Sequence, residues 1–248
     1  MQNKLNISVV IPFYNTPIKF FLKCIASVKK QQPYEIILVD DCSSDLDLVK
    51  IAKNSGCKYI RTAYQSGSDG HPFNLGVDVA KGNYICRVDS DDILLELPQK
   101  MPYDIHFGNA DRVLMPTRIN IVELILAPRA MFSAMVVKKE LLVKYALAED
   151  INVFADVLLT LRLLYNKHSY DVHEKVNYIY RKRENSIQSS HSLFQHRLRQ
   201  LQTVSRFCFL ENIDPQKSMY YLNLAMLNVQ YGSDSRKVFR HMKRRTTT

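Results

Sequence analysis

The sequence predicts an α/β fold in which helices cover both faces of a parallel sheet, followed by a helical extension. Short β-branched runs alternate with segments of helical spacing as far as residue 92. The expected strands are almost continuously apolar, which is typical of parallel sheets buried on both faces. From residue 191 onward the periodicity is helical only. With 46% hydrophobic residues in 248, the chain can bury a substantial core.

The first part of the chain repeats the order strand, loop, helix. Pro12 ends the first apolar run, and Thr16 with Pro17 supplies an N-cap and a first-turn proline for the helix that follows. Gly56 closes the second helix. The expected strands are residues 7–15, 34–41, 57–63 and 83–92, and the expected helices are 18–32, 42–56 and 71–82.

The second part predicts further strands and then helices alone. Asp214, Pro215 and Gly232 mark the start and the end of one of these helices. The expected strands are 103–108, 112–116, 129–137, 169–174 and one within 176–186, and the expected helices are 138–147, 154–164, 191–213, 214–232 and a basic tail.

Composition and charge exclude several classes of protein. There is no apolar run of transmembrane length and no leader pattern at the N-terminus, so we expect a cytoplasmic protein. The five cysteines form no C-x-x-C pair and are expected to be reduced. The net charge is +10, but no nucleic-acid-binding pattern accompanies it. The tail "SRKVFRHMKRR" is basic and weakly amphipathic, which suits peripheral contact with an anionic membrane or a solvated end segment.

Polar side chains follow three of the expected strands where each strand ends. They are Pro12, Tyr14 and Asn15 after the first strand, Asp40 and Asp41 after the second, and Asp89, Ser90, Asp91 and Asp92 after the fourth. Ligands of open parallel sheets bind at the carboxyl ends of the strands. The chain has neither G-x-G-x-x-G nor a P-loop, so a divalent cation is the expected means of holding phosphates.

The spacing in "DSDD" suits such a cation. Residues i and i+2 of a strand point to the same side, so Asp89 and Asp91 can face one metal ion, and Asp92 can join them if the chain turns. Aspartate is also common in turns and at helix starts, and that alternative stays open on spacing alone.

Several blocks in order resemble the signature of family 2 glycosyltransferases of the A-type fold. They are "SVVIPFYNT", "EIILVDDCSSD", "GVDVAKGNYICRVDSDD", "FADVLLTLRLL" and "YIYRKRENSIQ", spread over residues 7–190. The resemblance implies a Rossmann-like nucleotide-binding sheet and a glycosyltransferase domain over residues 1–190. Its nucleotide-sugar half would end near residue 97, its acceptor half would span 98–190, and a helical, basic extension would occupy 191–248.

The resemblance also implies roles for single residues. Pro12, Tyr14 and Asp41 would bracket the nucleobase, commonly uracil, and Asp89 would lie near the ribose. Asp91, and after it Asp92, would bind Mg²⁺ or Mn²⁺ bridging the diphosphate. The matching nucleotide-binding positions are completed by Asn15, Asn74 and Arg181. From the residues alone, Tyr14 could instead be a core aromatic and Asp41 a helix cap.

The resemblance assigns the catalytic base to the aspartate of an "ED" pair that opens a helix. Asp156 keeps the downstream spacing of that block, but Ala155 replaces the glutamate. An intact pair, Glu149 and Asp150, lies upstream and makes Asp150 the alternative. Asp156 also suits the positive end of a helix dipole without any catalytic role.

Two positions depart from the family pattern. Phe73 stands where an arginine is common, and Arg87 interrupts apolar strand positions, where a buried guanidinium needs a partner such as Asp69 or Asp78.

The resulting hypothesis is an inverting, metal-dependent glycosyltransferase. It would move a sugar from a nucleotide sugar, in first place a UDP-sugar, to a lipopolysaccharide, capsule or related surface glycan, free or lipid-linked. It would work in the cytoplasm or on the inner face of the cell membrane, and its C-terminal helices are candidates for a homodimer contact. The alternative is a catalytically impaired module that binds nucleotide sugars or acts as a scaffold.

Overall fold

The computed structural model describes residues 5–128, 132–151, 153–181 and 193–246. These residues form two compact units that interleave along the chain. The sheet unit comprises residues 1–117, 131–152 and 168–181, and the helical unit comprises 118–130, 153–167 and 182–248. The domain boundary expected at residue 190 lies outside the described residues.

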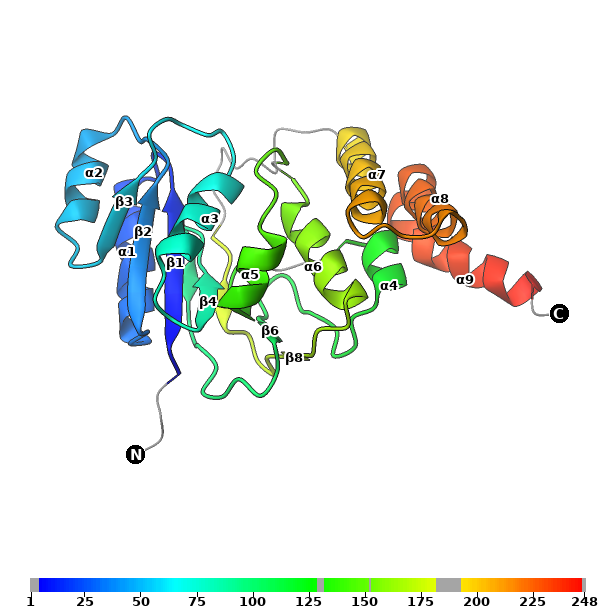
Figure 1. Cartoon of the computed structure of the whole chain (residues 1–248), viewed down its shortest axis with the longest axis horizontal. Coiled ribbons are helices and arrows are strands. Elements are labelled where there is room, and N and C mark those ends of the chain that lie inside the picture. Colours follow the sequence, from blue (N-terminus) through cyan, green and yellow to red (C-terminus); the bar gives the residue numbers. More distant parts are fainter. Residues whose placement is uncertain (1–4, 129–131, 152, 182–192, 247–248) are drawn as a thin grey trace. The chain divides into compact units, whose positions relative to one another are not determined.

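The sheet unit is built on a seven-stranded sheet in the order β3-β2-β1-β4-β7-β6-β8 (Figure 1). The strands are β1 (Ile7–Phe13), β2 (Glu35–Asp40), β3 (Lys58–Arg61), β4 (Tyr84–Arg87), β6 (Ile105–Phe107), β7 (Val136–Lys138) and β8 (Tyr170–Val172). The first four are parallel as predicted. Because β7 runs antiparallel to both β4 and β6, the complete sheet is mixed. A small second sheet pairs β5 (Ile93–Leu94) with β9 (Tyr178–Ile179).

Four helices flank this sheet. They are α1 (Ile18–Lys30), α2 (Leu46–Lys53), α3 (Gly70–Val79) and α5 (Lys139–Tyr145). α1 buries an apolar stripe and brings the Phe21 ring within 4.7 Å of Phe13. α3 crosses back over β1 and β2, where a side chain at Gly76 would clash with Val10. Right-handed crossovers in opposite directions place α1 and α3 on opposite faces, as Figure 1 shows.

The strand predicted over residues 112–116 is wrong. In its place the backbone groups of Ala110 and Val113 bond to each other across a tight turn. The Asn109 side chain accepts a hydrogen bond from the Met115 amide at 2.7 Å. That side chain takes the amide that a strand partner would have used, so the apolar run does not extend.

The helical unit contains α4 (Ile121–Leu126), α6 (Ala155–Tyr165), α7 (Leu193–Leu210), α8 (Pro215–Tyr231) and α9 (Ser235–Thr246). The predicted cap of α8 is confirmed, because the Asp214 side chain accepts from the Lys217 amide at 3.0 Å. Asn228 and Ser235 donate to the Leu126 carbonyl at the end of α4, a helix that the sequence did not predict. Within the described residues, no helix combines the length and the apolar character needed to cross a bilayer.

Candidate functional site

The polar ends of three strands meet at one edge of the sheet. β1 lies between β2 and β4 and runs parallel to both, so residues that follow these strands come out side by side. The Asp41 amide donates to the Phe13 carbonyl at 2.9 Å. The Thr16 and Ser90 hydroxyls, from the loops after β1 and β4, are 2.6 Å apart.

The two aspartates after β2 have different environments. Asp40 is buried, and its carboxylate accepts hydrogen bonds from Tyr59 at 2.7 Å and Arg61 at 2.6 Å, which makes it part of the structural core. Asp41 accepts from the amide and the hydroxyl of Ser66, at 3.1 and 3.0 Å, and from the Thr62 hydroxyl at 3.2 Å. Asp41 therefore holds the loop of residues 62–69 at the strand ends.

The residues after β1 divide between support and exposure. Pro12 is buried within the strand, whereas the Tyr14 side chain is 42% exposed. This exposure rules out a core role for Tyr14 and leaves its ring face accessible. Asn15 has a positive φ of 44°, and its side-chain oxygen accepts from the amides of Ser44 and Asp45, so it fixes the loop after β2.

Asp92 is the most enclosed of the acidic residues after β4. It is 1% exposed, and its two carboxylate oxygens accept from the Tyr178 hydroxyl at 3.0 Å and the Arg181 amide at 2.8 Å. Burial, followed by the nearby charge of Asp89, raises the pKa of Asp92 to about 7; Asp91 adds to the effect. Burial and the neighbouring acids therefore both disfavour the charged form of Asp92.

Arg87 and Asp89 form the other half of this group. The Arg87 guanidinium contacts Asp89 Oδ1 at 2.9 and 3.0 Å and Asp69 Oδ2 at 2.5 Å. The Ser133 hydroxyl donates to the remaining oxygen of Asp89 at 2.6 Å. Of the two partners expected for Arg87, the structure provides Asp69, and it adds Asp89. We refer to Asp69, Arg87, Asp89, Asp91 and Asp92 as the strand-end cluster.

Arg181 lies beside the strand-end cluster with its guanidinium directed toward α1. It stacks on the Phe20 ring at 4.6 Å and donates to the Phe20 carbonyl at 2.8 Å. Burial lowers the pKa of Arg181, against the influence of Cys24 and the nearby acids. In this conformation Arg181 supports the cluster from behind, and its nucleotide contact stays a prediction.

Asn74 serves a structural purpose that the sequence did not indicate. Its amide exchanges hydrogen bonds with the backbone of Leu147, at 2.8 and 3.0 Å, and donates to Glu149 at 2.8 Å. Glu149 also pairs with His71 at 3.0 Å. The loop that carries the Glu149–Asp150 pair is thereby fixed to the first turns of α3.

The two candidate bases belong to different units. Asp150 follows the fixed Glu149 in the sheet unit, and Asp156 lies in the first turn of α6 in the helical unit. The Asp156 carboxylate accepts from the amide of the next residue, Val157, at 2.8 Å within the first turn of α6. The catalytic role of either residue stays a prediction.

The donor set of the strand-end cluster fits a hard divalent cation in part. Among the described residues no group of three or more His, Cys, Asp or Glu is placed to hold a metal ion. The partly exposed Asp91 lies next to the enclosed Asp92, whose pKa is raised first by burial and then by the charge of Asp89. Magnesium-type sites commonly use one or two carboxylates and complete their shell with water and phosphate. One protein carboxylate with acidic neighbours is compatible with that pattern.

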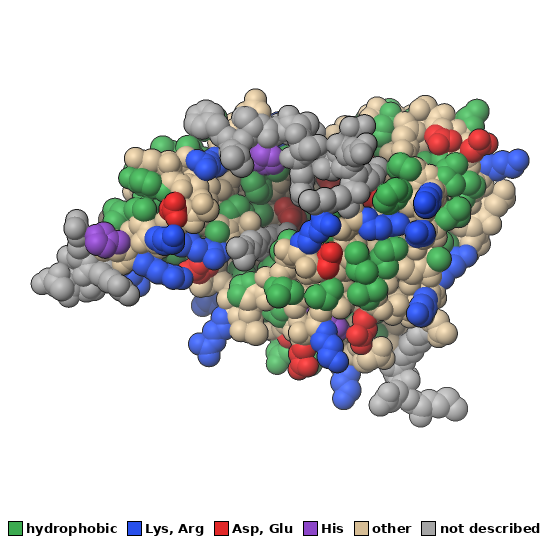
Figure 2. All heavy atoms as spheres, turned by 180° about the vertical axis from the view of Figure 1, so that it is seen from behind, with side chains coloured by type: hydrophobic (Ala, Val, Ile, Leu, Met, Phe, Trp, Pro, Cys, Tyr) green, Lys and Arg blue, Asp and Glu red, His purple; other side chains and the backbone are tan. Residues whose placement is uncertain are grey.

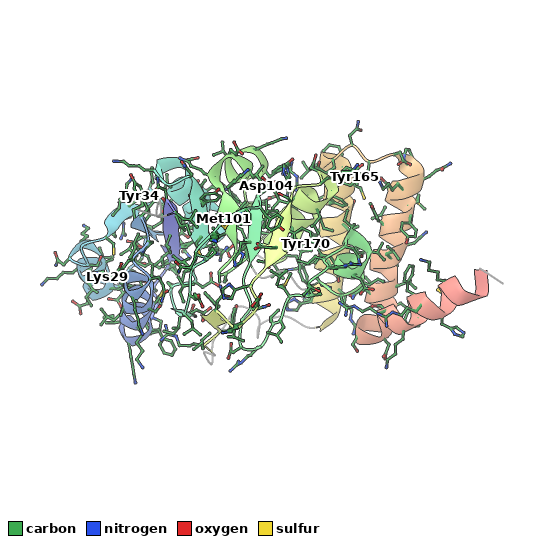
Figure 3. The ribbon with its side chains drawn as sticks, turned by 90° about the horizontal axis from the view of Figure 1, so that it is seen from below. Lys29, Tyr34, Met101, Asp104, Tyr165 and Tyr170 are labelled. Carbon is green, nitrogen blue, oxygen red and sulfur yellow. The ribbon has the colours of Figure 1, made fainter. Side chains whose placement is uncertain are left out.

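A hollow of about 400 Å³ opens elsewhere on the sheet unit, lined among others by Lys29 and Tyr34 (Figure 3). It lies at the amino ends of β2 and β3, beside residues 33–36 and 56–58. The strand-end cluster lies at the opposite ends of the parallel strands, so this hollow is separate from the candidate site.

Part of the chain is similar in sequence to known glycosyltransferases. Residues 8–117 match the family model described as glycosyl transferase family 2. Over 99 residues the chain is 42% identical to the glycosyltransferase GlyG of Streptococcus pneumoniae, a match covering 36% of this chain and 31% of that protein. It is 33% identical over 97 residues to the poly(ribitol-phosphate) β-N-acetylglucosaminyltransferase TarS of Staphylococcus aureus, covering 36% and 17%. These matches span less than a third of each relative's length.

Solved structures extend the likeness in fold to most of the chain. The structure of S. aureus TarS 1–349 in complex with UDP-GlcNAc superposes with a TM-score of 0.67, covering 93% of this chain and 73% of that one. The sequence identity is 20%, so this likeness concerns the fold.

Proposed function

Because residues 8–117 are a family 2 glycosyltransferase domain on the A-type fold, we propose that the protein transfers a sugar from a UDP-sugar to a cell-surface glycan. The observation that carries the proposal is the group of carboxylates at the carboxyl ends of β2 and β4, beside the exposed Tyr14 after β1. The names of several relatives, which are poly(ribitol-phosphate) glycosyltransferases, support the acceptor class.

The nucleoside would bind at the ends of β1 and β2. Tyr14 offers an exposed ring face for stacking, and the Asp41 carboxylate can accept the imide hydrogen of uracil. Asp89 can accept hydrogen bonds from ribose hydroxyls while Arg87 holds its orientation. Pro12 and Asn15 support this face from within the strand and the neighbouring loop.

Asp91 would be the protein ligand of Mg²⁺ or Mn²⁺, and Asp92 would add negative charge behind it. When bound, the cation would neutralise charge on the departing nucleoside diphosphate. Asp91 is the first choice for direct coordination because it is partly exposed, whereas Asp92 is 1% exposed.

Inverting transfer also needs a base. The acceptor oxygen attacks the anomeric carbon, the bond from that carbon to the diphosphate breaks, and the hydroxyl proton passes to a carboxylate. We favour Asp150, because its neighbour Glu149 is hydrogen-bonded to the first turns of α3. The start of that helix is linked to Asp89 by the ion pairs of Asp69 and Asp89 with Arg87. Asp156, favoured by motif spacing, is the alternative that mutation can test.

The basic helix α9 suggests where the enzyme works. Lys237 and Arg240 are 84% and 68% exposed, and on the face seen in Figure 2 blue side chains gather over this helix. Such a helix suits the anionic inner face of the cell membrane, where lipid-linked acceptors are made accessible. Cosedimentation with vesicles containing phosphatidylglycerol, lost in high salt and in Lys237→Glu/Arg240→Glu, tests this location.

One experiment separates the enzyme from a non-catalytic binding module. A panel of nucleotide sugars is screened by thermal shift with Mn²⁺, and UDP release is then measured for each donor that binds. Metal-dependent release that disappears in Asp91→Asn supports the transferase. Donor binding without turnover across all acceptors tried would instead support the module.

A further inference from the structure

The Arg87 side chain lies in an enclosure of two carboxylates and two aromatic rings. Its guanidinium pairs with Asp69 and Asp89 and lies 5.9 Å from the Phe73 ring centroid and 5.4 Å from that of Phe132. The side chain is 10% exposed. Burial alone would lower the pKa of Arg87, but Asp69 and Asp89 outweigh it and raise the pKa above its ordinary value. The guanidinium is therefore a permanent charge in a dry setting.

The contacts of Arg87 specify the orientation of Asp89. Two nitrogens of the guanidinium donate to Oδ1, and Ser133 donates to Oδ2. A planar fork of donors can hold a carboxylate in one orientation, which the single ammonium of a lysine cannot. Without Arg87, Asp89 would face Asp92 with its charge uncompensated, and repulsion would favour other rotamers.

Asp69 shows that the Arg87 contact prevails over a local alternative. Asp69 occupies the N-cap of α3, a position where aspartate commonly accepts from backbone amides of the first turn. Its side chain makes no such cap among the described residues and extends instead to Arg87. The end of the loop 62–69 is thus drawn toward β4 by an ion pair.

The same loop is held at a second point. Ser66 donates from its amide and its hydroxyl to Asp41 after β2. The loop therefore connects the two carboxylates that the proposed function assigns to the nucleoside. Asp41 binds its middle, and Asp89 binds its end through Arg87 and Asp69.

We propose that Arg87 is a positioning residue for donor binding. It orients Asp89 and anchors the loop 62–69, so that the carboxylates at the ends of β2 and β4 keep a fixed separation. This inference rests on the proposed function for its effect on the donor, and on the contacts alone for its effect on the loop.

The test compares Arg87→Met and Arg87→Lys with the wild type. The matched control is Lys138→Met on β7 of the same sheet. It removes the 2.7 Å ion pair between Lys138 and Asp104. Amide hydrogen exchange of residues 62–70 should rise about tenfold in Arg87→Met, with little change in residues 7–13 and no rise in the control. The KM for the donor should rise about tenfold with kcat within about threefold, and Arg87→Lys should recover only part of the loss.

A second variant serves in case Arg87→Met does not fold. Asp69→Ser keeps a good N-cap residue but is too short to reach the guanidinium. It should raise exchange in residues 62–70 while leaving Asp89 paired, with Asp45→Ser at the N-cap of α2 as its control.

The outcomes distinguish the two proposals. If the wild type binds and turns over no nucleotide sugar, the proposed function fails, and hydrogen exchange still decides whether Arg87 anchors the loop. Unchanged exchange in folded Arg87→Met and Asp69→Ser overturns the anchoring. If the wild type is active, an unchanged donor KM in folded Arg87→Met overturns the positioning role. The role is also overturned if kcat and donor affinity fall only in proportion to the fraction of folded protein.

Discussion

Two polar clusters of the sheet unit differ in how their charge is balanced. The second cluster, around the edge strand β8 and its neighbour β6, consists of Glu96, His106, Asp171 and His173, and we refer to it as the edge cluster. His106 bonds to Asp171 at 2.7 Å and to His173 at 3.1 Å, and His173 lies 3.6 Å from Glu96. Each imidazole therefore has a polar partner on both sides.

The difference indicates what marks a functional site. The edge cluster can balance itself, because its imidazoles can donate, accept or take up protons between two carboxylates. The strand-end cluster has four carboxylates and one guanidinium, which pairs with Asp69 and Asp89, and the pKa of Asp92 is raised to about 7 by burial and by its acidic neighbours. An excess of charge of one sign points to a missing ionic partner. The number of ionisable groups in a cluster does not.

Loss of the catalytic base should give the largest effect, because the base lies outside both clusters and neither can replace it. We expect Asp150→Asn to lower the rate of transfer by about 10³-fold with donor binding intact, since general base catalysis contributes 10² to 10⁴-fold. Initial rates and donor titrations measure this. Asp156→Asn is the matched variant; a large loss there, with Asp150→Asn active, would move the base to α6.

Neutralising one carboxylate in each cluster tests the comparison directly. Asp91→Asn should lower metal-dependent transfer by about 10²-fold, because it removes the proposed protein ligand of the cation. Asp171→Asn should stay within about threefold of the wild type, because the edge cluster has no part in the reaction. Rates are measured over a range of Mn²⁺ concentrations. Equal losses in the two variants would remove the functional distinction between the clusters.

Stability should respond in the opposite way. We expect His106→Ala to lower the free energy of unfolding by about 2 kcal/mol, since it leaves Asp171 and His173 without their shared partner and opens a cavity. Specific activity per folded molecule should be unchanged. Urea denaturation followed by circular dichroism measures the first quantity, and UDP release the second. A selective loss of activity would assign the edge cluster a role in the reaction.

The sequence indicated one cluster and not the other for a physical reason. Asp41, Asp89 and Asp91 follow apolar strands, and the rule that parallel strand ends converge brings them together without any coordinates. His106 and His173 are 67 positions apart and meet only because β6 pairs with β8. Nothing local in the chain records that pairing.

The same reasoning explains the other departures. Residues 112–116 had the composition of a strand, but Asn109 takes the Met115 amide and forms a turn. α4 is only 6 residues long, too short for a helical period to be recognised, and its end is satisfied by side chains from α8 and α9. The guanidinium of Arg87 was expected to need an acidic partner. That Asp89 is the second partner beside Asp69 depends on side-chain geometry, which the sequence does not show.

The smallest expected effect is a difference in pH dependence between the clusters, measured with EDTA present. Asp92 has its pKa raised from 3.8 to about 7, so between these values the native state holds a proton that the unfolded state has lost. The free energy of unfolding should therefore fall as the pH rises from 4 to 7. Burial, followed by the charge of His106, lowers the pKa of His173 from 6.5, so that residue should reduce stability as the pH falls below 6.5.

Urea denaturation from pH 5 to 8 separates these opposite contributions, each expected to be on the order of 1 kcal/mol. Asp92→Asn should flatten the loss of stability toward high pH, and His173→Gln should flatten the loss toward low pH. If both substitutions alter the same limb of the profile, the two clusters do not differ in charge balance. If they alter opposite limbs, the strand-end cluster is the one that gains most from a cation at neutral pH.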